Sequence, residues 1–521
     1  MTDEGRTNIA GHWPGRHVLS RNSTLLAAVG VIAAAALLVP AGPASADPMS
    51  TVPVPSVPVG APTYVGAPTA PDPVPDQPAP QNPFLAPNGF SEIHADGWQS
   101  DAFPQAGPLG RKPQVNSLLL GSLCGSITFD HAGRIITTCF GLHPGLYLID
   151  PRLDRVLAQH TLPGMSPMDL LKAVTGTGVP SGGYFYLDNL GRVVVGTATG
   201  HVQILAETPA ADGFVLDRDY DLTGVLQPGE SLTSLQPDSN GLMWFEGRKN
   251  GLVGTLDPKT GVAHAVRVGI GSDEEIVKSF TVGSHGDVYI VSNRQMYRFD
   301  AGPGQLPQIT WHTHYPNILQ VKPGQQDAGS GTTPTILGGG RYVAITDNAD
   351  PMDVVVYRTD PHAGQREVCS VPVFHQGSSA TSNSLIGIGN SMIVENNYGY
   401  TGPQATMLGK TTVPGFARID VDPGGNGCHA VWTNTTVSAA SVVSQLSLAT
   451  GLIYTYTKGA APTDPWYWTA LDFRTGRVVW QQMSGAGPQF NNNYAGIGLG
   501  PDGTAYLGTL GGIIAMRDTN Y

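Results

Sequence analysis

Polar residues suited to metal binding or acid–base chemistry recur after residue 120, each just beyond an apolar, strand-like run. They are Glu246, Asn293, Asp347, Asn348, Glu395, Asn396, Tyr398 and Lys458. Carboxylate and amide oxygens are the ligands that Ca²⁺ takes, with about six to eight around the ion. Asp347, Glu395 and Asn396 are therefore the candidate calcium ligands. The alternative is that these side chains only satisfy backbone groups where strands end.

The run from Met392 to Tyr400 is the most unusual of these places, because it has one carboxylate beside two amides and two phenols. Strand alternation should place Glu395 on one face of the strand and Asn396 on the other. A carboxylate buried at the end of a strand is costly unless it is paired or functional. Two interpretations stay open, a functional site and a buried structural network.

Two further clusters suggest chemistry more weakly. Trp311-His-Thr-His314 puts two histidines on one strand face, which suits a metal but is also ordinary for an exposed outer strand. Pro465-Trp-Tyr-Trp468 could bind the face of a sugar or polyphenol, or could pack between sheets. Nucleophile-elbow, phosphate-loop and dinucleotide motifs are missing, so no catalytic residue is assigned and enzymatic activity stays undecided.

A weak repeat of about fifty residues must position these side chains. It occurs eight times after residue 120, and each copy has a tight turn between two strand-like runs, such as Asp130-His-Ala-Gly-Arg134. This period in β-rich units is typical of an all-β fold, the β-propeller, in which four-stranded blades surround a channel. Eight blades are the leading count. Seven is the alternative, if the second repeat, degenerate around Glu207–Asp217, merges with a neighbour.

The last repeat ends at Asp518, where its fourth strand should begin. An unpaired strand edge at that place would invite aggregation. The segment from Phe90–Trp98 onward has no other assignment, so it is predicted to supply the missing outer strand and to clasp the two ends of the chain in one blade.

Four cysteines predict two disulfides, with three possible connectivities. Cys124 and Cys139 straddle the first turn almost symmetrically, so they should face each other on a hairpin. Cys369 and Cys428 each begin the outer strand of successive repeats, and such strands can approach at the rim. The predicted bridges are Cys124–Cys139 and Cys369–Cys428.

The N-terminal region is predicted to direct export. Arg16 and Arg21 precede an apolar run that ends at Val39, and Ala44-Ser45-Ala46 provides the small residues of a cleavage site. We therefore expect a signal peptide at residues 1–46, a Pro-rich disordered spacer at 47–88 and the propeller at 89–521. A retained membrane anchor is the alternative; after cleavage, no membrane span is expected.

The net charge of −12 argues against nucleic acid as a partner. It is compatible at most with affinity for cations. A monomer is expected.

One repeat carries a recognisable motif, Ala470-Leu-Asp-Phe-Arg-Thr-Gly-Arg-Val-Val-Trp480. It resembles the repeat of pyrroloquinoline quinone (PQQ)-dependent dehydrogenases and their non-enzymatic relatives, and the resemblance implies that Trp480 docks one blade on the next. It also implies calcium and PQQ as possible ligands of the channel. The chain lacks the adjacent cysteine pair and the haem attachment motif of many such enzymes, which argues against PQQ. The order of signal, Pro-rich segment and propeller resembles secreted actinobacterial proteins.

These observations favour a secreted or envelope-associated binding or scaffold propeller. Its partner would be an envelope polymer, a small molecule or a protein, held on one face. The alternative is a calcium-dependent enzyme with its site in the channel, either a quinoprotein-like oxidoreductase or a lactonase-like hydrolase.

Overall fold

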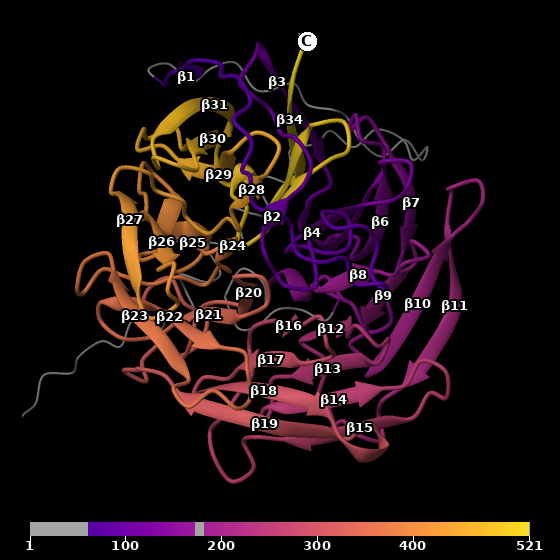
Figure 1. The fold of residues 1–521 in the computed structure, drawn as a ribbon. Coiled ribbons are helices and arrows are strands. Elements are labelled where there is room, and N and C mark those ends of the chain that lie inside the picture. The colour runs from indigo at the N-terminus through magenta and orange to yellow at the C-terminus, as the bar shows by residue number, and fades with distance from the viewer. Residues whose placement is uncertain (1–60, 172–181, 520–521) are drawn as a thin grey trace, which may run out of the picture. The chain divides into compact units, whose positions relative to one another are not determined.

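The computed structural model describes residues 61–171 and 182–519. The expected signal peptide and the first part of the Pro-rich segment lie outside the described residues. Within these ranges the chain forms eight sheets, antiparallel except for the pairing of Ala102–Phe103 with Gln445–Ser447, which follow one another round a common centre (Figure 1). The fold is an eight-bladed β-propeller, and the alternative of seven blades is wrong.

The turns between the first two strands of a blade set the local geometry. In blade 1, Asp130 Oδ1 accepts the backbone N–H groups of Ala132 and Arg134, each at 2.8 Å. Gly133 takes a φ of +76°, which an L side chain would strain. The same capping recurs at Asp188 in blade 2, so the weak Asp-x-x-Gly repeat encodes one structural unit.

The first four blades each contain four consecutive strands, from the innermost to the outermost. Blade 1 contains β4 (Ser122–Phe129), β5 (Ile135–Gly141), β6 (Gly145–Ile149) and β7 (Val156–His160). Blade 2 contains β8 (Phe185–Leu187), β9 (Val193–Gly196), β10 (His201–Glu207) and β11 (Phe214–Asp221). Blade 3 contains β12 (Ser234–Pro237), β13 (Met243–Gly247), β14 (Leu252–Leu256) and β15 (Ala263–Arg267). Blade 4 contains β16 (Thr281–Val282), β17 (Val288–Val291), β18 (Gln295–Ala301) and β19 (Pro307–His314).

The remaining blades follow the same plan, with additions at the ends of the chain. Blade 5 contains β20 (Thr335–Leu337), β21 (Tyr342–Thr346), β22 (Met352–Arg358) and β23 (Glu367–Val373). Blade 6 contains β24 (Ile386–Ile388), β25 (Ser391–Glu395), β26 (Phe416–Val421) and β27 (Cys428–Asn434). Blade 7 contains β28 (Gln445–Ser447), β29 (Leu452–Lys458), β30 (Pro465–Asp472) and β31 (Val478–Ala486), flanked by β1 (Tyr64–Gly66) and β2 (Ala102–Phe103). Short 3₁₀ turns are η1 (Pro303–Gln305), η2 (Pro403–Thr406) and η3 (Pro488–Phe490).

Blade 8 joins the two ends of the chain. It contains β32 (Ile497–Leu499), β33 (Ala505–Thr509), β34 (Gly512–Asp518) and, as its outer strand, β3 (Pro113–Leu119). Seven register pairs link β3 antiparallel to β34, from Pro113↔Asp518 to Leu119↔Gly512. The predicted clasp is therefore confirmed, but the strand that forms it lies downstream of Phe90–Trp98, which runs along the channel instead.

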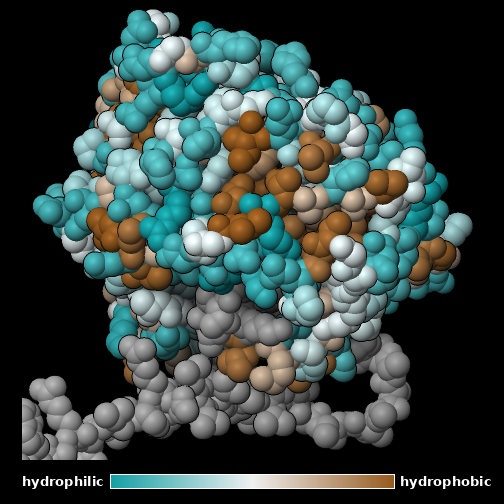
Figure 2. Space-filling model, turned by 90° about the horizontal axis from the view of Figure 1, so that it is seen from below, coloured by the Kyte–Doolittle hydropathy of each residue, from teal (hydrophilic) through white to brown (hydrophobic). Residues whose placement is uncertain are grey.

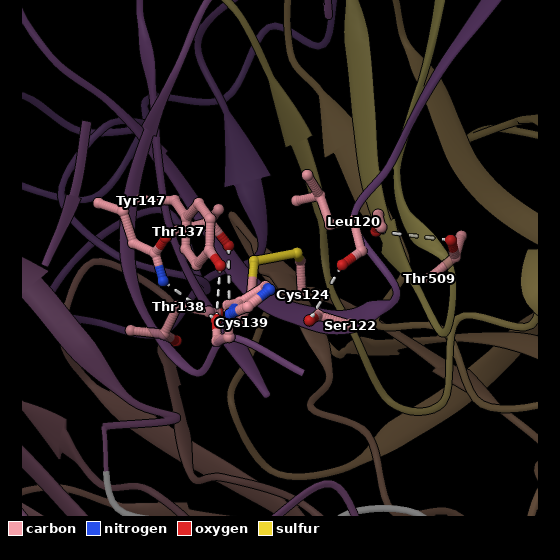
Figure 3. The surroundings of a disulfide bond; sticks show 11 residues. Leu120, Ser122, Cys124, Thr137, Thr138, Cys139, Tyr147 and Thr509 are labelled. Carbon is pink, nitrogen blue, oxygen red and sulfur yellow. Dashed lines mark hydrogen bonds between the residues drawn. A yellow bond between two sulfur atoms is a disulfide. The ribbon is translucent and has the colours of Figure 1, made fainter. Parts of the chain in front are cut away.

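Both predicted disulfides are present. Cys124 and Cys139 are register partners on β4 and β5, with their Cα atoms 4.0 Å apart, and Figure 3 shows the bridge between the two strands. Cys369 on β23 and Cys428 on β27 join the outer strands of blades 5 and 6, with their Cα atoms 5.8 Å apart. The first bridge locks one hairpin, and the second ties neighbouring blades together at the rim.

Aromatic and aliphatic side chains fill the space between blades. Trp480 is fully buried, in a cluster with Ile386 of blade 6, Leu446 of blade 7 and Ile497 of blade 8. It therefore lies where the repeat motif predicts a docking residue. No helix in residues 61–171 or 182–519 is long and apolar enough to cross a membrane.

The rim carries a few exposed apolar side chains. Val262 precedes β15, Leu306 precedes β19 and Ile309 lies on β19, and each is more than 40% exposed. Figure 2 views the molecule from the side on which β15 and β19 lie in Figure 1, and apolar residues form patches there between polar ones. Scattered exposed apolar residues of this kind are ordinary on a folded surface.

The Pro-rich segment differs from the spacer that its composition predicts, at least from residue 61 onward. β1 pairs antiparallel with β31, and Val74 is 6% exposed. The backbone N–H groups of Asp72 and Val74 donate to carbonyls of blade 7, at 3.0 and 2.9 Å. Packing against the propeller therefore begins well before the expected boundary at residue 88.

Candidate functional site

Residues 82–103, here called the plug segment, run along the inner strands at one end of the channel. Their carbonyl groups accept hydrogen bonds from one inner-strand N–H in each of five blades. The bonds are Leu187 to Ser91 (2.7 Å), Val282 to Gly97 (2.9 Å), Ile336 to Trp98 (3.0 Å), Gly387 to Ser100 (2.8 Å) and Leu446 to Asp101 (2.9 Å). Inner strands present unpaired edges to a propeller channel, and the plug segment satisfies them.

An ion pair lies inside the plug segment. His94 Nδ1 is 3.0 Å from Asp101 Oδ1, and both side chains are almost fully buried. Burial lowers the pKa of His94, but the carboxylates around it, Asp101 first and then Glu92 and Asp96, together outweigh burial and raise the pKa above 6.5. Gln445 of blade 7 donates a second hydrogen bond to Asp101, at 2.8 Å. The plug is thus fixed to a blade by polar contacts as well as by its backbone.

Two more buried carboxyl groups lie beside this pair. Glu92 accepts a hydrogen bond from Gln99 Nε2 at 2.7 Å, and burial raises its pKa to about 8. Asp96 accepts bonds from the Ser100 hydroxyl (2.5 Å) and the Trp98 N–H (2.9 Å), and burial raises its pKa to about 7. The floor of the channel therefore holds carboxyl groups that keep a proton near neutral pH.

Glu395 lies at the end of β25, 4% exposed, inside a network drawn from blades 6 and 7. Asn383 and Asn397 donate to its Oε1, the latter at 3.2 Å. The Ser444 hydroxyl donates to Oε2 at 2.5 Å and lies 2.9 Å from the Thr455 hydroxyl. Burial raises the pKa of Glu395 to about 7 even though these donors favour the ionised form.

Glu246 on β13 has a different setting. It is 0% exposed, and neither carboxylate oxygen has a hydrogen-bond partner among the described residues. Burial raises its pKa well above 4.5. A buried carboxylate without a partner is costly to ionise, so burial favours the protonated form of Glu246.

A cavity of about 90 Å³ remains in the channel beside the plug segment. His94, Tyr184, Lys278 and Tyr494 are among the residues that line it. Lys278 Nζ donates to Gln326 Oε1 and Ser382 Oγ, each at 3.3 Å, and burial lowers its pKa. Pockets for drug-sized ligands have volumes of about 300–1,000 Å³, so a quinone of three fused rings does not fit here.

The three candidate calcium ligands lie in separate hydrogen-bond settings. Asp347 Oδ1 accepts the backbone N–H groups of Ala349 and Asp353, and burial raises its pKa to about 7. Asn396 donates to the Ser378 carbonyl and accepts from the Ala380 N–H, and neither group belongs to the network around Glu395. Among residues 61–171 and 182–519, no group of three or more His, Cys, Asp or Glu side chains could hold a metal ion. Asn397, rather than Asn396, joins Glu395.

The other candidate side chains mostly hold loops together. Asn293 Oδ1 accepts the Glu275 N–H at 2.9 Å, and Asn348 Nδ2 donates to Asn317 Oδ1 at 2.9 Å. Lys458 Nζ is 3.0 Å from Asp464 Oδ1, and burial lowers its pKa. Tyr398 is half-buried, and its backbone N–H donates to Asn396 Oδ1 at 3.1 Å.

The structure also places the aromatic cluster at 465–468 and the histidine pair at 312 and 314. Trp466 and Trp468 are at most 1% exposed and pack on Tyr456, with ring centroids 5.4 and 5.7 Å away, so no ligand reaches them. His312 lies on the outer strand β19, where its Nδ1 is 2.6 Å from Gln295 Oε1.

Sequence reasoning missed the acids of the plug segment. Glu92, His94, Asp96 and Asp101 were unassigned because residues 90 onward were expected to form an outer strand. The available signal was composition: four ionisable side chains within ten residues do not fit a half-buried strand.

Comparison with known proteins gives the following similarities. No family model matches the chain. An uncharacterized protein of Archaeoglobus fulgidus is 25% identical over 321 residues, which is 55% of this chain and 61% of that protein. This chain thus spans about three fifths of that relative's length. Among solved structures, a quinohemoprotein alcohol dehydrogenase from Comamonas testosteroni has a TM-score of 0.51 at 11% identity, over 85% of this chain and 82% of its own. BamB from Moraxella catarrhalis has a TM-score of 0.43 at 12% identity, over 83% and 97%. The similarity to the dehydrogenase supports the propeller fold alone.

Proposed function

We propose that this chain is an exported β-propeller that binds a component of the cell envelope on one face and performs no chemistry in its channel. The observation that carries the proposal is the plug segment. It occupies one end of the channel, is hydrogen-bonded to five blades and leaves a cavity of about 90 Å³. A channel used in this way by the chain itself has little room for a substrate and a cofactor.

Export is supported by the cysteines and by the N-terminal sequence. All four cysteines of the chain are paired in the structure, and structural disulfides persist mainly in oxidising compartments. The apolar run that ends at Val39 and the small residues after it have the pattern of a signal peptide. A binding partner in the envelope is the simplest use for a protein delivered there.

A second candidate function, an enzyme with its site in the channel, is favoured by one observation. His94, Tyr184 and Lys278 face the same small cavity, and the pKa of Lys278 is lowered by burial. Perturbed ionisable groups in a cavity are a common mark of active sites. The two candidate functions predict different thermal behaviour. The enzyme should be stabilised by Ca²⁺ and PQQ, and the binding protein should not.

The test is thermal unfolding of the purified protein with Ca²⁺, with PQQ and with both, together with elemental analysis and sedimentation with isolated envelope polymers. We expect no rise in the melting temperature with Ca²⁺ or PQQ, because a ligand stabilises a protein only if it binds the folded state. We also expect the protein to sediment with at least one polymer fraction. A rise with PQQ that needs Ca²⁺ and is lost in Lys278→Met would overturn the proposal in favour of the enzyme.

A further inference from the structure

A groove of about 780 Å³ lies on the side of the propeller that carries the first turns of the blades. Its floor is formed by the turns of blades 4, 5 and 6. One wall is residues 76–80 of the Pro-rich segment, and another is Trp98 and Ser100 of the plug segment. Its volume is within the range of about 300–1,000 Å³ that ligand sites occupy.

The floor of the groove carries few side chains, because the turns of blades 5 and 6 depart from the Asp-x-x-Gly repeat. In blade 5 the turn is Gly338-Gly-Gly-Arg341, and in blade 6 it is Gly387-Ile-Gly-Asn390. Gly338, Gly339 and Gly340 have φ values of +64°, +68° and +87°. An L side chain is strained in this conformation, so the glycines keep the floor open.

The wall at 76–80 belongs to residues 75–81, here called the strap, which are held at both ends. At one end, Arg474 of blade 7 donates to the carbonyls of Asp72 and Pro73, each at 2.9 Å. At the other end, Asn82 Nδ2 donates to the Pro237 carbonyl of blade 3 at 2.9 Å. Prolines at 75, 78 and 80 fix φ, so the strap is extended and stiff before any ligand arrives.

The groove offers one aromatic surface and a mixture of polar groups. Trp98 is half-buried beside the glycine turn, where a Cβ on Gly340 would lie 3.6 Å from its ring. Arg341 and His285 are exposed at the groove, and Arg341 uses Nε to donate to the Gly338 carbonyl at 2.7 Å. Asp76 supplies an exposed carboxylate from the strap.

The charges of the groove nearly balance. Its lining contains two arginines and three aspartates. Arg418 and Asp420 pair through two bonds of 2.8 Å, which leaves Arg341 and Asp76 as the exposed charges of opposite sign. A strongly anionic or cationic ligand would gain little here.

We infer that this groove binds a neutral polysaccharide of the cell envelope. A sugar ring has an apolar C–H face that matches Trp98 and hydroxyl groups that need both donors and acceptors, which Arg341, His285 and Asp76 provide. The inference rests on the proposed function and gives it a site and a ligand class. An extended peptide is the other occupant that a groove of this size could take, and it is one arm of the test.

The test is native affinity electrophoresis of the protein, purified after export so that its disulfides form. The gels contain dextran, mannan or arabinan as neutral polymers, polygalacturonate as an acidic one, or a polyproline peptide. We expect retardation by at least one neutral polymer. Trp98→Ala should weaken this binding by about tenfold or more, the effect of losing an aromatic contact in a site, and Trp98→Phe should restore most of it.

Phe84→Ala is the matched control, because Phe84 is an exposed aromatic residue of the same segment outside the groove. It should bind like the original protein. Arg341→Ala and His285→Ala keep the test decisive if Trp98→Ala fails to fold, because both side chains are exposed and each should weaken binding.

The outcomes separate this inference from the proposed function. If the protein binds a neutral polymer and all three groove variants bind it equally well, the groove assignment is overturned and the binding function stands. If only polygalacturonate or the peptide retards the protein, the ligand class is overturned. If no probe binds, the inference fails, and sedimentation with envelope fractions still decides the proposed function.

Discussion

Glu395→Gln should stabilise the protein at pH 8 and have no such effect at pH 4. Glu395 is 4% exposed, and burial raises its pKa from 4.5 to about 7. At pH 4 the folded and unfolded chains both hold the proton. As the pH rises from 4.5 to 7, the unfolded chain releases the proton while the folded chain retains it, so the free energy of unfolding falls.

The magnitude follows from the size of this rise. One pKa unit corresponds to about 1.4 kcal/mol, so a carboxyl group raised from 4.5 to about 7 costs the fold about 3 kcal/mol above pH 7. Glutamine carries no such penalty. Its oxygen can accept from Asn383 and Asn397, while its NH₂ can donate to Ser444, whose hydroxyl turns toward Thr455 at 2.9 Å.

The assay is the melting temperature of the original protein and the variant between pH 4 and pH 8.5. An unfolding entropy of about 2 cal/mol/K per residue converts 3 kcal/mol into a rise of about 3 °C for a domain of this size. Glu367→Gln on the exposed face of β23 is the control for removing one carboxylate, and its curve should run parallel to that of the original protein. If Glu395→Gln lowers the melting temperature equally at pH 5 and pH 8, the carboxylate is ionised in the fold and the reasoning is refuted.

Three other perturbations test the fold. Replacing Cys369 and Cys428 by serine opens a loop of 59 residues and should lower the free energy of unfolding by about 4 kcal/mol in urea titrations; an unchanged midpoint would contradict this. His94→Gln should destabilise more at pH 5.5 than at pH 8, because a raised histidine pKa contributes stability below 6.5 that is lost as the pH rises through the folded value. Melting curves at the two pH values check this, and equal losses would argue against a charged histidine. A chain that starts at residue 120 lacks β3 and the plug segment and should not fold, whereas one that starts at residue 82 should fold with a lower melting temperature; circular dichroism distinguishes the two.

The blades could be predicted from the sequence because each repeat encodes its own turns. Asp130 and Asp188 mark the capped turns that separate adjacent strands, and the structure has them in that role. The ambiguity at Glu207–Asp217 arose because Thr208, rather than an aspartate as in Asp257-Pro258, precedes the proline of this turn. In the structure β10 and β11 pair despite a register shift between Ile204 and Leu205.

The clasp could be predicted only in part. The last repeat ends at Asp518 without its fourth strand, which showed that an outer strand must come from elsewhere in the chain. It did not show which residues supply it, because a pairing such as Pro113↔Asp518 spans some four hundred residues and leaves no local pattern. The disulfide partners were accessible because hairpin symmetry and blade periodicity place the cysteines.

The surroundings of Glu395 show how much of the candidate site could be predicted from the sequence. Glu395 is the last residue of β25, and Asn396, which follows it, donates to the Ser378 carbonyl. The partners Asn383 and Ser444 come from the approaches to two different inner strands, and no spacing in the sequence brings them together. The loop after β21 folds so that Asp347 Oδ1 accepts the backbone N–H groups of Ala349 and Asp353, and the sequence does not show this loop conformation.

The clasp has a consequence for when the protein can fold. The outer strand of blade 8, β3, is made some four hundred residues before its partner β34. The plug segment likewise waits for inner strands such as β28, whose Gln445 bonds to Asp101 across 344 residues. Contacts of such long sequence separation slow folding. The ring can therefore close only after β34 has been made, and until then β3 lacks its partner strand in blade 8.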